Sequence, residues 1–236
     1  MKRKIEELYW RELIWQRPFK IEAVWELLSH LSALSPRGAI IFEARGRSSL
    51  VSYYLGADAK YIRKIEEACK SHGNIQFYTA PEDIRRPVAT AKRLRITRPV
   101  LSLKTDISMS VIRAGLAAMS AIRKGEESVL QVVLGGAYAP MSVPADMPDP
   151  TVSWLRAMLG NVAQASPESR SSAKEKAGQH GFQAVIRLGV SGDTGISRIH
   201  SIHSALKTLE TAGVRIYAEN EKAHRINSAH VPVPRK

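Results

Sequence analysis

The chain has 236 residues, 44% of them apolar and 24% charged, which suffices for one large domain or two of about 100 residues. Its 35 Lys and Arg outnumber 22 Asp and Glu, and the formal net charge of +13 indicates an anionic partner such as nucleic acid or acidic lipid. The alternative is a charge that only keeps the protein soluble. The single cysteine, Cys69, excludes an internal disulfide framework and a cysteine-rich zinc site. No apolar run is long enough to cross a bilayer, so we expect a cytoplasmic chain without a membrane span.

Residues 1–82 show the segment order strand, helix, strand, strand, helix, strand. This is the order of a ferredoxin-like unit, a four-stranded antiparallel sheet with two helices on one face. Hydrophobic spacing and turn residues place the last five segments at 21–34, 39–45, 50–55, 58–72 and 74–79. Residues 8–15 (LYWRELIW) fit a strand or a helix equally well, and only the need for a fourth strand favours the strand.

The same segment order recurs over residues 93–222, after a basic linker at 83–92. Strands are predicted at 94–103, 128–134, 182–190 and 214–218, with helices at 108–124 and 196–212. The sequence therefore predicts an α+β fold of two tandem ferredoxin-like (βαββαβ) units with antiparallel sheets.

The second unit carries a long insertion, residues 135–181, where a hairpin would suffice. We expect a short amphipathic helix at 151–159 and a mobile polar stretch at 164–181. The tail 223–236 has no periodicity, and we expect an extended linker to a motor domain.

The densest basic stretch of the chain runs through the first strand of the second unit. Arginines in a row on a sheet can neutralise phosphates without reading sequence. The residues that we expect to contact nucleic acid are Arg93, Arg95, Arg98 and Lys104. The alternative is a charged edge that discourages the addition of another strand.

A glycine-rich turn, GVSGDTG, leads from a predicted strand into the last long helix. Free backbone N–H groups at such a turn can hold an anion, here at Gly192, Asp193, Thr194 and Gly195. The alternative is a flexible connection capped by Asp193 or Thr194. A hydrolase that uses Asp193 is a further alternative.

The usual catalytic signatures are missing from the sequence. It contains no GxxxxGK[ST], HExxH, CxxC or GxSxG motif, so we expect no catalytic residue, no metal site and no cofactor in this chain. His200 and His203 stand at i, i+3 spacing, but without further ligands nearby packing is the preferred interpretation.

Several stretches resemble conjugative DNA-transfer proteins, namely type IV secretion ATPases of actinobacterial type. They are LYWRELIWQRPF, RGAIIFEARG, SYYLGAD, SVLQVVLGGA and GFQAVIRLGV, and the resemblance covers most of residues 8–227. It implies a region that precedes a RecA-like motor, which binds ATP and Mg²⁺ in its own Walker motifs. None of those motifs maps onto this sequence.

The resemblance implies a non-catalytic N-terminal region that docks and oligomerises such an ATPase. Its expected partners are other secretion or conjugation components, further copies of the chain, and DNA through the basic surface. It would lie in the cytoplasm or at the cytoplasmic face of the membrane through a secretion complex. The alternative is a stand-alone basic nucleic-acid-binding module.

Overall fold

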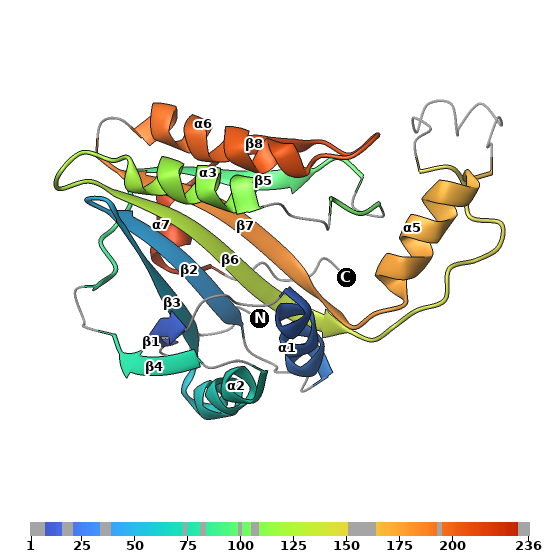
Figure 1. Cartoon of the computed structure of the whole chain (residues 1–236), viewed down its shortest axis with the longest axis horizontal. Helices are drawn as coiled ribbons and strands as arrows, with labels where there is room; N and C mark the ends of the chain where they lie inside the picture. The colour runs from blue at the N-terminus through green and yellow to red at the C-terminus, as the bar shows by residue number, and fades with distance from the viewer. Residues whose placement is uncertain are drawn as a thin grey trace.

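The computed structural model describes residues 8–15, 21–33, 39–72, 75–80, 84–98, 101–104, 109–150, 164–192 and 195–230. In these ranges the chain forms one antiparallel sheet of eight strands and six α-helices (Figure 1). The prediction of an α+β fold with antiparallel strands is confirmed. No helix in this part of the chain has the length and apolar character needed to span a membrane. The predicted helix at 151–159 lies outside the described residues.

The first half of the sheet has the strand order β4-β1-β3-β2. β1 is a strand, as predicted, and pairs antiparallel with a neighbour on each side, through Leu13 to Tyr53 and to Phe77. Both neighbours form hydrogen bonds with the backbone of β1. This pairing makes residues 8–15 a strand, although their side-chain pattern also fits a helix. The elements are β1 (Leu8–Trp15), α1 (Ile21–Ala33), β2 (Ile40–Arg47), β3 (Leu50–Asp58), α2 (Ala59–His72) and β4 (Ile75–Thr79).

The second half repeats this order, read inward from the other edge as β8-β5-β7-β6. Its first strand begins at Thr90, so residues 90–92 belong to the sheet and not to the linker predicted over 83–92. Its last strand begins two residues later than predicted. The elements are β5 (Thr90–Ile96), α3 (Met109–Ser120), β6 (Glu127–Tyr138), β7 (Gly181–Ser191), α6 (Gly195–Leu206), a 3₁₀ turn (Lys207–Leu209) and β8 (Ile216–Glu221).

The two halves join where β2 pairs antiparallel with β6, and we call this junction the seam. The pairing runs from Ile40 opposite Leu134 to Gly46 opposite Ser128. The strands therefore form one continuous sheet, whereas the sequence suggested a sheet for each unit.

The apolar cores on the helix-covered face cross the seam. The core under α1 and α2 includes Leu134 of β6, and Val132 and Phe182 of the second half pack against it. The core under α3 and α6 receives Ala44 and Val51 from the first half. Each half therefore completes part of the other's core.

The helix α3 approaches the backbone of β2 at Gly46. A Cβ at this position would lie 2.1 Å from the carbonyl oxygen of Met119, so only glycine fits. The hydroxyl of Ser128, opposite Gly46 on β6, donates a hydrogen bond of 2.7 Å to the same oxygen. The end of α3 is thus fixed directly over the seam.

Two further segments are more regular than the sequence suggested. The stretch expected to be mobile contains a helix, α5 (Pro167–Ala177), which begins with Ser166 accepting a hydrogen bond from the Ser169 N–H. The tail expected to be extended begins with a short helix, α7 (Ala223–Asn227). Residues 231–236 lie outside the described part of the chain.

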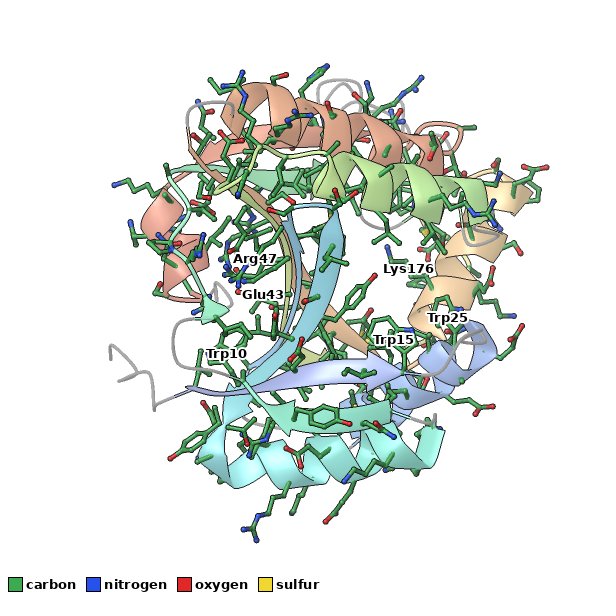
Figure 2. The ribbon with its side chains drawn as sticks, turned by 60° about the vertical axis from the view of Figure 1, so that its left-hand side comes forward. Trp10, Trp15, Trp25, Glu43, Arg47 and Lys176 are labelled. Carbon is green, nitrogen blue, oxygen red and sulfur yellow. The ribbon has the colours of Figure 1, made fainter. Side chains whose placement is uncertain are left out.

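The side chains divide between two faces of the sheet. Figure 2 shows Trp10, Glu43 and Arg47 on one side, and Trp15, Trp25 and Lys176 on the other. The face that carries Glu43 is opposite to the one covered by α1, α2, α3 and α6, because Phe42 and Ala44 pack into the helix-side cores.

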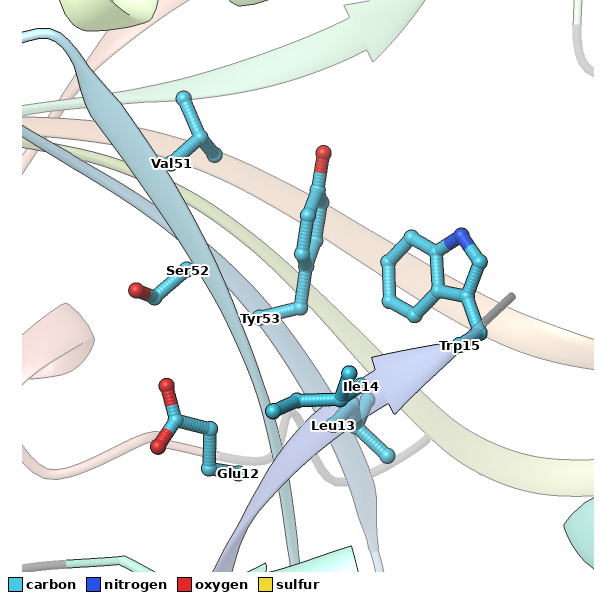
Figure 3. Close-up of a pocket in the computed structure, with 7 residues that line it drawn as sticks. All are labelled: Glu12, Leu13, Ile14, Trp15, Val51, Ser52 and Tyr53. Atoms are coloured by element: carbon cyan, nitrogen blue, oxygen red, sulfur yellow. The ribbon is translucent and has the colours of Figure 1, made fainter. Parts of the chain in front are cut away.

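A cleft of about 260 Å³ opens where β1 leaves β3 (Figure 3). The pairing with β3 stops at Leu13, whereas Ile14 and Trp15 continue the pairing with β4. The rings of Trp15 and Tyr53 lie 4.3 Å apart at its helix side. The cleft is thus a consequence of strand splaying at the outer part of the first half.

Candidate functional site

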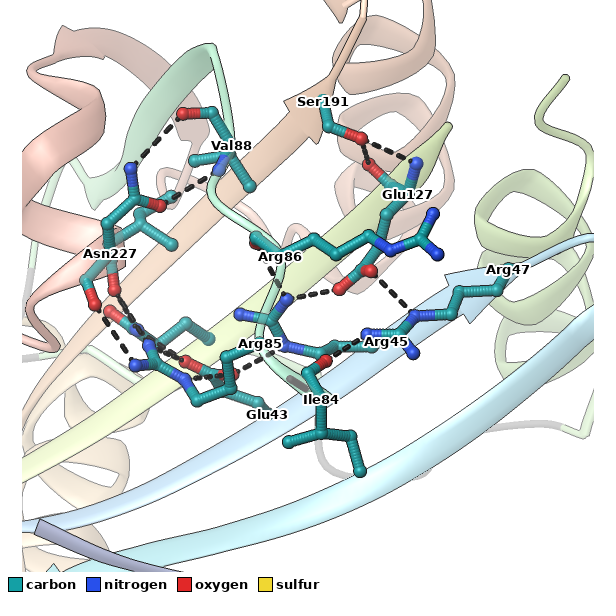
Figure 4. A network of polar contacts seen from close by, with 12 residues as sticks. Glu43, Arg45, Arg47, Ile84, Arg85, Arg86, Val88, Glu127, Ser191 and Asn227 are labelled. Atoms are coloured by element: carbon teal, nitrogen blue, oxygen red, sulfur yellow. Dashed lines mark hydrogen bonds and ion pairs between the residues drawn. The ribbon is translucent and has the colours of Figure 1, made fainter. Parts of the chain in front are cut away.

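The face of the sheet opposite the helices buries charged side chains at the seam. Glu43, Arg45 and Glu127 are each at most 1% exposed, and Gln131 is fully buried beside them. Charged residues are almost never buried without partners. We call Glu43, Arg45, Arg47, Arg85, Glu127 and Gln131 the seam network, and Figure 4 labels its five charged members.

Arg45 lies at the centre of this network and bridges the two strands of the seam. Its Nε donates to Glu43 Oε2 at 2.7 Å, on the same strand, and its Nη1 donates to Glu127 Oε1 across the seam. Arg47 donates to the second oxygen of Glu127 at 2.6 Å. Each carboxylate of the network is thus bound by two arginines or more, because Glu43 also binds Arg85.

Residues 84–89 are the described part of the predicted linker that precedes β5, and from here on we call them the linker. They cross over this network between β4 and β5. Arg85 donates to both oxygens of Glu43, at 2.8 and 3.1 Å, and its guanidinium carbon lies 4.1 Å from the ring centroid of Trp10. The carbonyl oxygens of Ile84 and Arg86 accept hydrogen bonds from Arg47 and Arg45. The linker is therefore fixed by its backbone as well as by its side chains.

Residues 223–230, which we call the C-terminal segment, lie over the same face. The carbonyl oxygen of Ile226 accepts hydrogen bonds from Arg85 and Gln131, both at 3.0 Å. The side-chain amide of Asn227 pairs with both backbone groups of Val88, at 2.9 and 3.2 Å. Ile226 itself is fully buried against Val88, Ala91 and Val129.

The network shifts the ionisation of its buried groups in the direction that keeps them charged. Burial opposes ionisation of Glu43, but the hydrogen bond from Arg85 and the charges of Arg45 and Arg85 outweigh it, so the pKa of Glu43 lies below its ordinary value. Burial likewise disfavours the charge on Arg45, yet Glu43 and Glu127 raise the pKa of Arg45. The ions therefore stabilise one another, as in a structural ion cluster.

A second group of charged residues continues this face toward the β8 edge. Arg187 is buried on β7; its Nη1 donates to Gln131 at 2.8 Å and its Nη2 to the carbonyl of His230 at 2.6 Å. Its Nε lies 3.7 Å from Glu221, too far for a hydrogen bond, while Arg225 binds Glu221 at 2.8 Å. Burial, the largest cause, lowers the pKa of Arg187 to about 10.

The four basic residues predicted to bind nucleic acid have different neighbours and different partners in the structure. Arg93 lies on β5 directly opposite Arg187. Arg95 forms an exposed ion pair of 2.9 Å with Glu219, and Arg98 donates to the carbonyl of Gly213 at 2.6 Å. The exposed Lys104 follows the buried Leu101 and donates its backbone N–H to the carbonyl of Leu209. The structure thus keeps Arg93 and Arg95 on one strand, while Arg98 and Lys104 follow that strand.

The predicted anion-binding turn is described only at its ends. Asp193 and Thr194 lie outside the described residues. Gly192 has φ of +97°, and a Cβ there would lie 2.7 Å from a carboxylate oxygen of Glu126. Gly195 begins α6 and is buried beside Thr90. A carboxylate next to Gly192 disfavours an anion at that end of the turn.

Of the two histidines of α6, His203 contacts the backbone of β8. The Nε2 atom of His203 lies 3.1 Å from the carbonyl oxygen of Ile216. Across the described ranges, no group of three or more histidine, cysteine or acidic side chains is placed to hold a metal ion.

Sequence reasoning missed the seam network. Its signal was present in the segment IIFEARGR of β2, where Glu43 and Arg45 alternate with apolar residues. Such a pattern normally indicates a solvent-exposed face. Here the linker and the C-terminal segment cover that face, and no local sequence pattern indicates this cover.

Comparisons of the chain with protein-family models, curated proteins and solved structures found no match. The resemblance to conjugative DNA-transfer proteins therefore remains a prediction from the stretches quoted above. What the geometry establishes is a sheet face with a buried ion cluster, closed by two chain segments far apart in sequence.

Proposed function

We propose that the chain is a non-catalytic docking and oligomerisation region of a conjugative DNA-transfer ATPase of the type IV secretion kind. The observation that carries this proposal is the attachment of the C-terminal segment to the seam network. A segment held by Arg85, Gln131 and the Asn227–Val88 pair gives whatever follows it a fixed starting point. A platform that positions a motor needs such a rigid connection.

The proposal includes the finer description of the fold as two tandem ferredoxin-like units. The identical strand order of the two halves, β4-β1-β3-β2 and β8-β5-β7-β6, supports it. Pairing of β2 with β6 would then make one scaffold from two such units. The insertion with α5, which stands to one side of the sheet in Figure 1, would be available for contacts with secretion components.

Exposed apolar side chains near the β4 edge support the proposed contacts with other copies of the chain or with partner proteins. Ile14 and Tyr78 are each about half exposed, at 50% and 49%, on the face of the sheet opposite the helices. Trp25 of α1 is 48% exposed on the other side. Exposed aromatic side chains of this kind are enriched at protein interfaces.

The second candidate function is a stand-alone basic module that binds nucleic acid. The observation that favours it is the buried Nε atom of Arg93, which has no hydrogen-bond partner in the part of the chain that the structure describes. The net charge of +13 also supports an anionic partner.

The docking proposal is tested by determining the reading frame that follows codon 236 in the source gene. We expect it to continue in frame into a domain with a GxxxxGK[ST] loop. If it does, the ATPase rate and oligomeric state of that longer protein should fall when Arg85 is changed to Ala, because the connection loses its anchor. A stop codon directly after codon 236 would refute the proposal and leave the basic module.

A further inference from the structure

Arg93 belongs to a group of buried polar side chains on the face of the sheet opposite the helices. Within the described residues, three buried atoms of this group lack a hydrogen-bond partner, namely Arg93 Nε, Arg187 Nε and Glu221 Oε2. Leu94 packs into the core under α3 and α6, so the alternation of side chains directs Arg93 and Arg95 to the opposite face. The Nε atom of Arg93 is buried, and among the described residues it has no hydrogen-bond partner. Leaving a buried donor unpaired is costly, and such a group calls for an explanation.

Positive charge exceeds negative charge around Arg93. The residues that act on it electrostatically are Arg95, Arg225, Glu219 and Glu221, and Arg187 lies opposite it on β7. Arg225 binds Glu221 through Oε1 only, and Glu219 is bound by Arg95. The buried Oε2 of Glu221 has no hydrogen-bond partner among the described residues. Burial, and then the repulsion from Arg95, lower the pKa of Arg93, whereas an anion in this position would remove the excess of charge.

An aromatic side chain stands beside this group on the same face. Tyr217 of β8 lies directly opposite Arg95 in the register and is 42% exposed. Residues two apart on a strand are separated by about 6.6 Å, so Tyr217 lies near both Arg93 and Arg95. The neighbouring ion pair of Arg95 with Glu219 is about half exposed on both sides, and such surface pairs contribute little to stability. Arg95 can therefore exchange Glu219 for another anion.

We propose that Arg93, Arg95 and Tyr217 form a binding site for single-stranded nucleic acid at the β5–β8 edge. Arg93, whose Nε has no hydrogen-bond partner among the described residues, binds a backbone phosphate, and Arg95 binds the same or the next phosphate. Tyr217 stacks on a base, a contact that combines with phosphate binding in proteins that hold single strands without reading sequence. The site goes beyond the docking role and does not depend on it.

The test is the binding of a fluorescently labelled oligothymidylate to the 236-residue chain, measured by anisotropy over a series of salt concentrations. Arg93→Gln should weaken binding about tenfold or more, and should reduce the slope of log affinity against log salt by about 0.7, since one phosphate contact is lost. Arg63→Gln removes the same charge from the exposed side of α2 and should change neither property by a comparable amount. Circular dichroism checks that each variant is folded.

Variants of Tyr217 distinguish the binding of a nucleic acid from the binding of other anions. Tyr217→Ala should weaken oligonucleotide binding several-fold, and Tyr217→Phe should not, because stacking needs the ring and not the hydroxyl. Polyglutamate serves as a competitor that carries charge without bases.

Equal binding by the wild type, Arg93→Gln and Arg63→Gln, or no binding by the wild type at low salt, would overturn the site. Displacement by polyglutamate as effective as by unlabelled oligonucleotide, with no effect of Tyr217→Ala, would overturn the nucleic-acid assignment in favour of an acidic protein. None of these outcomes bears on the reading frame after codon 236, so the docking proposal stands or fails separately.

Discussion

The guanidinium of Arg85 binds both carboxylate oxygens of Glu43, with N–O distances of 2.8 and 3.1 Å. Arg85 belongs to the linker and Glu43 to β2, so this contact attaches the connection between the two halves to the seam. The same arginine donates to the carbonyl oxygens of Ile226 and Asn227. One side chain thus joins three parts of the chain that are remote in sequence.

Replacing Arg85 by alanine should lower the free energy of unfolding by about 3–5 kcal/mol, because a buried carboxylate loses a bidentate partner. The neighbouring Arg86→Ala is the matched control, since its side chain is exposed and only its backbone carbonyl takes part. Urea unfolding at pH 7 measures both. Equal effects of the two changes would show that the Arg85–Glu43 contact is not important for stability.

Acid should weaken the fold through Glu43. Its pKa is lowered in the folded state, so its contribution is complete above the ordinary value of 4.5 and is lost as the pH falls through the folded-state value. Glu43→Gln should therefore be about 3 kcal/mol less stable than the wild type at pH 7. This difference should shrink below pH 4.5.

His230 also makes the fold less stable in acid, and its effect begins at a higher pH than that of Glu43. Burial and the charges of Arg187 and Arg225 lower its pKa, so its contribution is present above the ordinary value of 6.5 and falls as the pH decreases. Both proteins keep His230, and its effect cancels when Glu43→Gln is compared with the wild type. A difference that stays constant from pH 7 to pH 3 would contradict the ionised state of Glu43.

The shared cores predict that the two halves unfold together. Leu134 is buried on β6 but packs with α1 and α2 of the first half. Leu134→Ala should destabilise the whole chain by about 2–5 kcal/mol and keep a single calorimetric transition. Ile202→Ala, in the core under α3 and α6, should shift the same transition. Two separate transitions, each shifted by one variant only, would show that the halves are independent domains.

Cys69 should be inert in the folded protein. It is buried in the core of the first half, and burial raises the pKa of its thiol to about 12. Because the thiolate is the reactive form, modification by a disulfide reagent at pH 8 should be about a thousandfold slower than in urea. A native rate close to that in urea would mean that α2 opens readily.

Much of the sheet could be predicted from the sequence, because strands with a buried face alternate clearly. The segment FQAVIRLGV is an example, and β7 contains it. The pairing of β2 with β6 could not be predicted, since it depends on which edges meet in three dimensions. The helix α5 was detectable, because Ser166 and Pro167 are a typical helix start, but its polar composition concealed it.

The site was harder to predict than the fold. Arg93 was identified from local charge density, and the structure adds what that pattern lacks, namely which arginines already have partners. The helix α7 has five residues and no periodicity of its own, and it is stabilised by burial of Ile226. Tertiary contacts of this kind are not visible in a local pattern.

The central claim is that the C-terminal segment is an anchored part of the seam, and native-state hydrogen exchange tests it most directly. The amides of Ser228, Ala229 and His230 bond to carbonyls within the segment, and the amide of Val88 bonds to Asn227. We predict that these four amides exchange slowly in the wild type and that Arg85→Ala accelerates all four together. Exchange of the three C-terminal amides at the rate of an unstructured peptide, with Val88 still protected, would contradict the account.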